Sequence, residues 1–87
     1  MVTNRLERFQ TALDACVRLK DKYPEGLGLT SIIKQIEYLI SLETGRSTDR
    51  SRLKDIVIGV HAAKEIEPVD AKLAELLYLV DNEAQRM

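Results

Sequence analysis

The sequence has one cysteine, Cys16, and one histidine, His61, among its 87 residues. A single cysteine cannot form an internal disulfide, and its place among apolar residues indicates a small buried side chain in a reducing compartment. A zinc site needs three or four Cys, His or carboxylate ligands, and acid–base catalysis needs titratable groups gathered in one site. The glycines around Leu27 lack the third glycine and the preceding strand of a dinucleotide-binding loop. We therefore predict no catalytic residues, no metal and no cofactor.

The sequence also lacks an excess of charge of either sign, because 13 basic residues face 14 acidic ones. Without an overall positive field, we expect no binding to nucleic acid. The longest apolar run surrounds Ile56-Val57-Ile58 and is far shorter than the roughly 20 residues of a membrane span. The first residues contain no apolar core of a signal peptide. These absences predict a soluble, cytoplasmic protein with no membrane contact.

What the sequence does contain is a balance of 45% hydrophobic and 31% charged residues. This balance is typical of a globular fold and is too apolar for a disordered tail. A chain of this length can bury only one core, with roughly 60% of its unfolded surface. We predict a single domain over residues 1–87.

Apolar residues in the first half of the chain recur at spacings of three and four, which is the period of a helix. Asn4 predicts the start of a first helix, and Tyr23-Pro24 predicts its end. Thr30 or Ser31 is expected to cap a second helix that ends near Gly45. The residues expected to face the core are Leu6, Phe9, Leu13, Cys16 and Val17 in the first helix and Leu29, Ile32, Ile33, Ile36, Leu39 and Ile40 in the second.

A third helix is expected from near Asp49 to before Pro68, and Asp70 is expected to cap a fourth. Gly59 inside the third helix costs about 1 kcal/mol relative to alanine, which indicates close packing against another helix. The expected inward residues are Leu53, Ile56, Val57, Val60 and Ala63, then Leu73, Leu76, Leu77, Val80 and Ala84. Short connections favour antiparallel neighbours, so the predicted fold class is all-α, a compact bundle of about four antiparallel helices.

Tyr38 lies nearly opposite Ile36 and Ile40 on the second helix, at about 100° per residue, and Leu42 follows one turn later. With Glu37 beside them, they predict a small apolar strip outside the core, and an exposed tyrosine is a common interface anchor. Alternatively, a neighbouring helix or a loop covers both side chains. The sequence leaves both interpretations open.

Charged residues gather at the turns on either side of the third helix. Arg50 lies in the first turn, and Glu65, Glu67 and Asp70 place three carboxylates around the second, where they could engage a basic cleft. His61 lies on the edge of the same helix. Alternatively, the turns are simply solvated and the histidine is a boundary residue. The residues predicted to bind a partner are Glu37, Tyr38, Leu42, Arg50, His61, Glu65, Glu67 and Asp70.

Several stretches between residues 20 and 80 together resemble a known family. They are Tyr23-Pro24, Lys34-Gln35-Ile36-Glu37-Tyr38-Leu39, Asp49-Arg50-Ser51, Gly59 and Ala63-Lys64-Glu65. In residue type and spacing they are similar to the small bacterial immunity proteins that neutralise type VI secretion effectors with an NAD(P)+ glycohydrolase toxin domain. These stretches belong to a scaffold and carry no chemical signature of their own.

The resemblance implies an all-helical inhibitor that binds a cognate effector toxin domain, occludes its active site and holds no cofactor or enzyme activity itself. Related immunity proteins can face toxin domains of other chemistry, such as ADP-ribosyltransferases or nucleotide pyrophosphokinases, so the toxin's substrate stays open. The residues alone also allow a helical adaptor or structural protein without a toxin partner. Such a protein would form a homo-oligomer, when free, through the apolar strip around Tyr38.

Overall fold

The structure is a computed structural model that describes residues 4–87, so Met1–Thr3 lie outside the described residues. Its elements are α1 (Arg5–Lys22), α2 (Leu29–Glu43), the 3-10 turn η1 (Leu53–Asp55), α3 (Ile58–His61), the π turn η2 (Ala62–Ile66) and α4 (Ala71–Gln85). Within residues 4–87 there are four α-helices and no strand. The predicted all-α fold with about four helices is confirmed.

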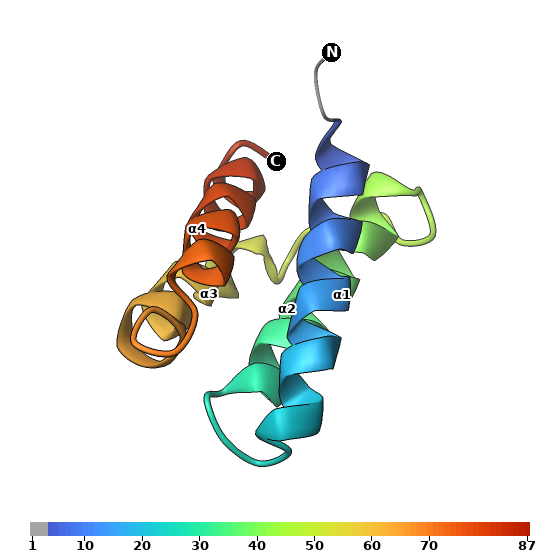
Figure 1. The fold of residues 1–87 in the computed structure, drawn as a ribbon. Coiled ribbons are helices and arrows are strands. Elements are labelled where there is room, and N and C mark those ends of the chain that lie inside the picture. The colour runs from blue at the N-terminus through green and yellow to red at the C-terminus, as the bar shows by residue number, and fades with distance from the viewer. Residues whose placement is uncertain (1–3) are drawn as a thin grey trace.

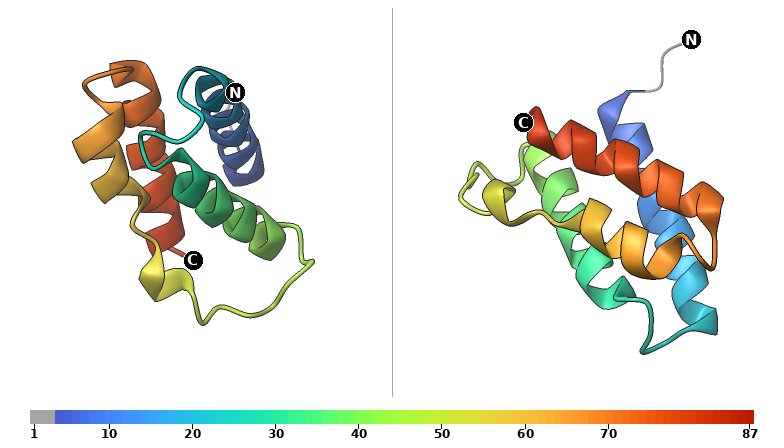
Figure 2. Two further views of the ribbon diagram at one scale, coloured as in Figure 1. Left: turned by 90° about the horizontal axis from the view of Figure 1, so that it is seen from below. Right: turned by 90° about the vertical axis from the view of Figure 1, so that its left-hand side faces the viewer.

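The helices form two antiparallel hairpins, one of α1 and α2 and the other of α3, η2 and α4 (Figure 1). α1 packs against both α2 and α4, and α4 also packs against α3 and η2. Figure 2 shows the two hairpins from two further sides. The described chain measures 33 × 31 × 20 Å, so it is flattened and each helix keeps one side near the surface.

One apolar core joins all four helices and the π turn. Its fully buried members include Phe9, Ala12, Cys16, Ile32, Ile36, Leu39, Ile58, Ala62, Ile66, Leu77 and Val80. Removing each large aliphatic or aromatic side chain from water contributes roughly 1.5–3 kcal/mol to folding. The buried residues of the first, second and fourth helices lie at helical spacing. Other residues expected to face the core are exposed or only partly buried, and these are Leu6, Leu13, Val17, Ile33, Ile40 and Leu76.

Three of the predicted helix ends are confirmed by their local geometry. The Asn4 side-chain oxygen accepts a hydrogen bond from the Glu7 backbone N–H at 2.7 Å. The Asp70 carboxylate accepts one from the Leu73 backbone N–H at 3.0 Å. Each bond satisfies an amide that has no partner inside its own helix. Gly45 follows α2 with a φ of 81°, the left-handed conformation that favours glycine.

The start of α2 differs from its prediction, since the helix begins at Leu29 and the residue before it is Gly28. Gly28 has a φ of 63°, and a Cβ atom placed on it would lie 2.6 Å from the Glu65 Oε2 atom. Neither Thr30 nor Ser31 caps the helix, so that prediction was wrong. The chain instead enters α2 through a left-handed glycine that packs closely against the second hairpin.

The third helix is much shorter than predicted, because residues 44–57 form a connection and α3 begins only at Ile58. The Asp49 carboxylate accepts a hydrogen bond from the Ser51 N–H at 3.0 Å, which makes a local turn in place of a helix cap. The Val57 N–H donates to the Gln35 side-chain oxygen at 2.8 Å, and this bond holds the end of the connection against α2. The β-branched residues before Gly59 add little helix propensity to oppose these bonds.

The buried face of this segment also differs from its prediction. Ile58, Ala62 and Ile66 are fully buried, whereas Val57 and Val60 are 43% and 54% exposed. A four-residue spacing drifts around an α-helix of 3.6 residues per turn. The wider π turn at η2 corrects the drift and keeps all three buried side chains on one side. Ala63 is likewise exposed, and Leu53 and Ile56 are only partly buried.

Gly59 lies where α3 approaches α4. A Cβ atom on Gly59 would lie 3.1 Å from the Asp81 Oδ2 atom, closer than an ordinary van der Waals contact. The close packing that the sequence predicted for this glycine is confirmed.

Candidate functional site

Tyr38 and Leu42 do not form an exposed strip. Leu42 is only 7% exposed, so the structure favours the alternative in which another part of the chain covers this side chain. Tyr38 is partly buried, and its hydroxyl donates a hydrogen bond to the Asp49 carbonyl at 2.7 Å and accepts one from the Arg52 N–H at 3.2 Å. The connection of residues 44–57 thus folds back over the outer side of α2. Tyr38 anchors this connection, and its partly buried side chain also lines the groove between α2 and residues 52–56.

Three charged residues predicted to bind a partner also hold the chain's own backbone or side chains. The Arg50 guanidinium donates a hydrogen bond to the Met87 carbonyl at 2.8 Å. The Glu67 carboxylate accepts one from the Tyr78 hydroxyl at 2.6 Å, and this bond raises the pKa of Tyr78. Asp70 caps α4. The structure therefore gives each of these residues an intramolecular role.

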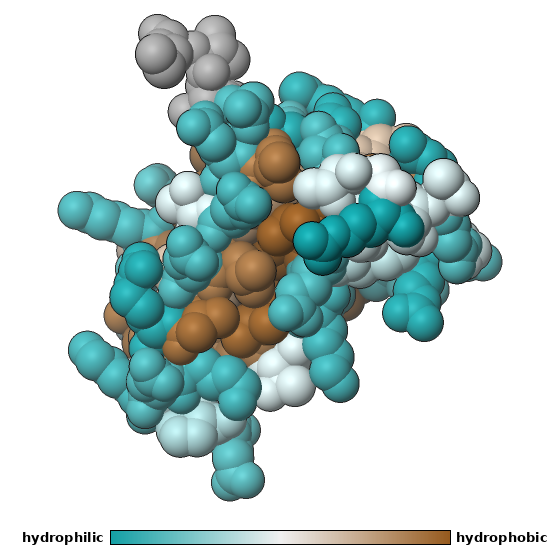
Figure 3. All heavy atoms as spheres, turned by 90° about the vertical axis from the view of Figure 1, so that its right-hand side faces the viewer, coloured by the Kyte–Doolittle hydropathy of each residue, from teal (hydrophilic) through white to brown (hydrophobic). Residues whose placement is uncertain are grey.

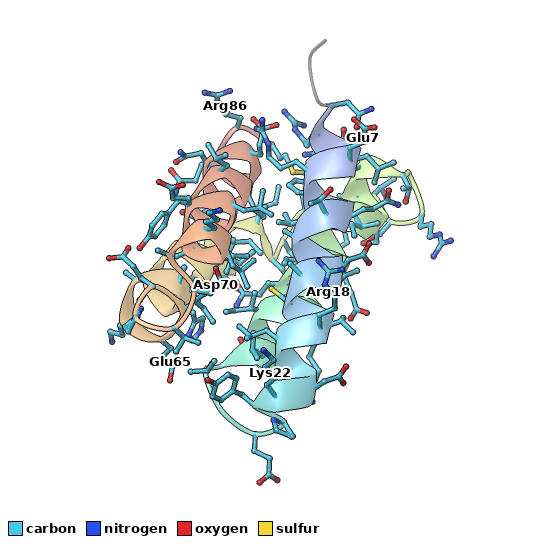
Figure 4. All side chains as sticks on the ribbon, viewed as in Figure 1. Glu7, Arg18, Lys22, Glu65, Asp70 and Arg86 are labelled. Carbon is cyan, nitrogen blue, oxygen red and sulfur yellow. The ribbon has the colours of Figure 1, made fainter. Side chains whose placement is uncertain are left out.

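His61 and Glu65 lie one helical turn apart, with 3.9 Å between His61 Nδ1 and Glu65 Oε2. Both side chains approach the α1–α2 connection at Gly28. Figure 4 shows Glu65 at the same end of the molecule as this connection and Asp70 at the start of α4. The pair remains partly exposed, but it belongs to the contact between the two hairpins.

Glu37 differs from the other seven predicted residues. Its side chain is exposed on α2, and within residues 4–87 it makes no hydrogen bond or ion pair. A carboxylate in this position is free to meet a cation of another protein. The structure therefore directs attention to the surface next to Glu37.

That surface is an apolar face over the seam between α1 and α2, here called the hairpin face. Its members are Leu6, Leu13 and Val17 of α1 and Ile33 and Ile40 of α2. Figure 3 shows apolar side chains gathered between two polar borders on this side of the molecule. Val17 is 48% exposed, and the other four are partly buried. The face forms because each set of residues repeats at spacings of four and seven along its helix.

The sequence placed these five residues in the core, since their spacing is the same as that of buried residues. The apolar stripe of α2, however, includes Ile33 and Ile40 in addition to the fully buried Ile32, Ile36 and Leu39. A stripe of this width exceeds what the other helices of a small bundle can cover. The width of this apolar stripe is the feature of the sequence that could have predicted an open apolar face.

A groove of about 580 Å³ lies on another side, between α2 and residues 52–56. Lys34 and Arg52 in its lining are offset by Glu25 and Asp55. Thr30 and Ser31 supply hydroxyl groups, but the lining contains no histidine or cysteine that could activate them. The groove can hold polar groups and offers no arrangement for nucleophilic catalysis.

Burial raises the pKa of the Cys16 thiol to about 11, so the thiol is neutral at physiological pH. Among residues 4–87, no three His, Cys, Asp or Glu side chains are placed to hold a metal ion. No helix in this part of the chain has the length and apolar character needed to cross a membrane.

Comparison with known proteins adds a family to this geometry. The sequence model of the Tsi6 family matches residues 4–86. The immune protein Tsi6 of Pseudomonas aeruginosa is 35% identical over 72 residues, which cover 83% of this chain and 77% of that protein. A chain in the structure of Tse6 in complex with Tsi6 superposes with a TM-score of 0.89 and 31% identity, over 97% of this chain and 89% of that chain. The structure of Tsi6 from Pseudomonas aeruginosa has a TM-score of 0.86 and 30% identity, over 94% of this chain and 95% of that chain.

Proposed function

This chain belongs to the Tsi6 family, and we propose that it is an immunity protein that binds a cognate bacterial toxin domain and blocks the active site of that domain. The observation that carries the proposal is the match to Tsi6, which is named an immune protein and whose fold was solved together with Tse6. The free carboxylate of Glu37 beside the open hairpin face is consistent with a protein that binds another protein.

We further propose that residues 1–87 act as one domain in the cytoplasm, without turnover of any substrate. Occlusion needs only a complementary surface, since an inhibitor that fills an active site excludes the substrate by occupying its space. The resemblance of the sequence extends the proposal to a type VI secretion effector that degrades NAD(P)+. In this proposal the chemistry belongs to the partner, and the chain supplies shape and charge.

The test is protection of cells from the toxin encoded beside this chain's gene. Cells that express the toxin domain should stop growing and lose NAD(P)+, and cells that also express this chain should keep both. The two proteins should copurify in a fixed ratio. Cells that express the chain alone, or the toxin alone, are the controls. If the neighbouring gene encodes no toxin, or if the chain neither protects cells nor copurifies with it, the proposal is wrong.

The open hairpin face also favours a second candidate function, a protein that self-associates. Light scattering on the purified chain distinguishes the two candidates, because a structural oligomer keeps its size without a toxin. Tyr38→Ala is a poor variant for this test, since Tyr38 holds the connection at Asp49 and Arg52. Val17→Asp is suitable, because it changes an exposed side chain.

A further inference from the structure

The hairpin face lies along the seam of α1 and α2, where its side chains remain partly or half exposed. The opposite side of α1 packs against α4, and α2 also contacts α3. Val17 at the C-terminal end of the α1 stripe is 48% exposed. Apolar patches of this kind on a small protein mark a surface that another molecule covers.

Carboxylates border this face. Asp14 and Asp21 of α1 and Glu37 of α2 are exposed, and none of them has an ion pair within residues 4–87. At 100° per residue they fall next to Val17 and Ile33 on their helices. Lys20 lies near the same seam and is partly buried, and the exposed Arg18 and Lys34 lie about 100° from Val17 and Ile33, further round their helices than the carboxylates. The residues immediately next to the apolar centre are therefore net acidic.

We propose that the hairpin face is the surface that binds the toxin domain, and that the matching surface of the toxin is apolar at its centre and basic at its edge. The proposal rests on the proposed function and names the surface that carries it. Val17, Ile33 and Ile40 supply the apolar contact, and the three bordering carboxylates pair with lysine or arginine side chains of the partner. Such charges speed encounter and select the correct partner, whereas the apolar centre holds the complex together.

A second copy of this chain is a poorer occupant of the same face. Two copies placed face to face would bring two sets of Asp14, Asp21 and Glu37 around one buried apolar patch. Like charges at the edge of an interface disfavour association. A basic partner converts the same carboxylates from a repulsion into an attraction.

The first experiment measures the affinity of the purified chain for the purified toxin domain encoded beside its gene. Val17→Asp and Ile33→Asp should each weaken binding by about 100-fold or more, because each places a carboxylate in the apolar centre. Val60→Asp on α3 is the matched control, since Val60 is 54% exposed and Val17 is 48% exposed. It should leave the affinity unchanged. Circular dichroism should show the same helix content for all three variants.

The second experiment tests the acidic border. The variant Glu37→Lys should slow association about 3-fold at low salt, with less effect at high salt. Glu75→Lys, which changes an exposed carboxylate of α4 far from the seam, should not slow it. Equal slowing by both changes would mean that overall charge, and not the border of the hairpin face, sets the rate.

The outcomes of these experiments distinguish a wrong binding surface from a wrong function. If the wild-type chain does not bind the toxin domain, the proposed function fails, and this proposal fails with it. If the wild type and Val17→Asp bind equally well while Arg52→Glu in the groove does not bind, the function stands and the contact lies in the groove. If Val17→Asp only dissolves a homodimer and leaves toxin affinity unchanged, the hairpin face is a self-association surface and this proposal is overturned.

Discussion

The two hairpins of this fold use their outward side chains differently. The α1–α2 hairpin consists of two long regular helices, and apolar side chains continue from its core to an open face. The second hairpin and the connection before it also expose apolar side chains, among them Val57 and Val60. They differ in that polar side chains, such as Arg50, Glu67 and Asp70, satisfy their own backbone and neighbours. A side chain engaged in this way is less available to a partner.

Truncation of single side chains to alanine should show the largest difference in stability between the buried and open sides of the first hairpin. Phe9→Ala should lower the free energy of unfolding by about 3–5 kcal/mol, because Phe9 is fully buried in the core. Val17→Ala, on the same helix but half exposed, should change it by less than about 1 kcal/mol. Urea unfolding followed by circular dichroism measures both. Similar losses would mean that the hairpin face is as well packed as the core.

The position of the connection (residues 44–57) over α2 should depend on the hydroxyl group of Tyr38. Tyr38→Phe removes the hydrogen bonds to Asp49 and Arg52 and should lower the free energy of unfolding by about 1–1.5 kcal/mol. Amide hydrogen exchange should accelerate at Arg52 while the amides within α1 stay protected. Tyr23→Phe, which changes an exposed tyrosine at the end of α1, is the control. Unchanged exchange at Arg52 would show that the hydroxyl is not what holds the connection.

The helix caps should have smaller effects that differ between helices. Asp70→Ala should lower the free energy of unfolding by about 1 kcal/mol, since it leaves the Leu73 amide without its partner. Thr30→Ala should have almost no effect, because α2 begins at Leu29 after Gly28. Thermal unfolding of the two variants gives the comparison. If Thr30→Ala lowered the free energy of unfolding more than Asp70→Ala, Thr30 would cap α2 as the sequence predicted.

Ionisation of the Cys16 thiol should change the free energy of unfolding only in alkaline solution and not at neutral pH. The thiol ionises near its ordinary pKa of 9.0 in the unfolded chain, but burial raises the pKa to about 11 in the folded protein. Between these values the unfolded state releases a proton that the folded state keeps, so the free energy of unfolding should fall as pH rises. The same titration of Cys16→Ala should fall less steeply over this window. Parallel curves would contradict the burial of the thiol.

Local patterns in the sequence predicted most of the α1–α2 hairpin and α4. Asn4 and Asp70 cap their helices as expected, and the spacing of Phe9, Cys16, Ile36 and Leu77 placed them correctly in the core. These features depend on residues within a few positions of one another. Helix periodicity and capping describe such short-range relations directly.

The third helix and the partner surface depend on contacts between distant residues, and periodicity does not report these. Gln35 binds Val57 across 22 positions, and Tyr38 binds Arg52 across 14. These bonds hold residues 44–57 against α2 in place of a longer third helix. Of the eight residues predicted to bind a partner, only Glu37 is both exposed and free of hydrogen bonds and ion pairs within residues 4–87. The hairpin face escaped prediction because its residues have the same spacing as the core.

The short connection between α1 and α2 also has a consequence for the order of events in folding. The two helices are neighbours in sequence and pack along their length, so their contacts close small loops and can form early. α4 must come from the far end of the chain to complete the core on their other side. During synthesis the first hairpin leaves the ribosome before α4 does. The open face can therefore take shape while the rest of the core is still being made, and a partner met at that moment would already find its docking surface.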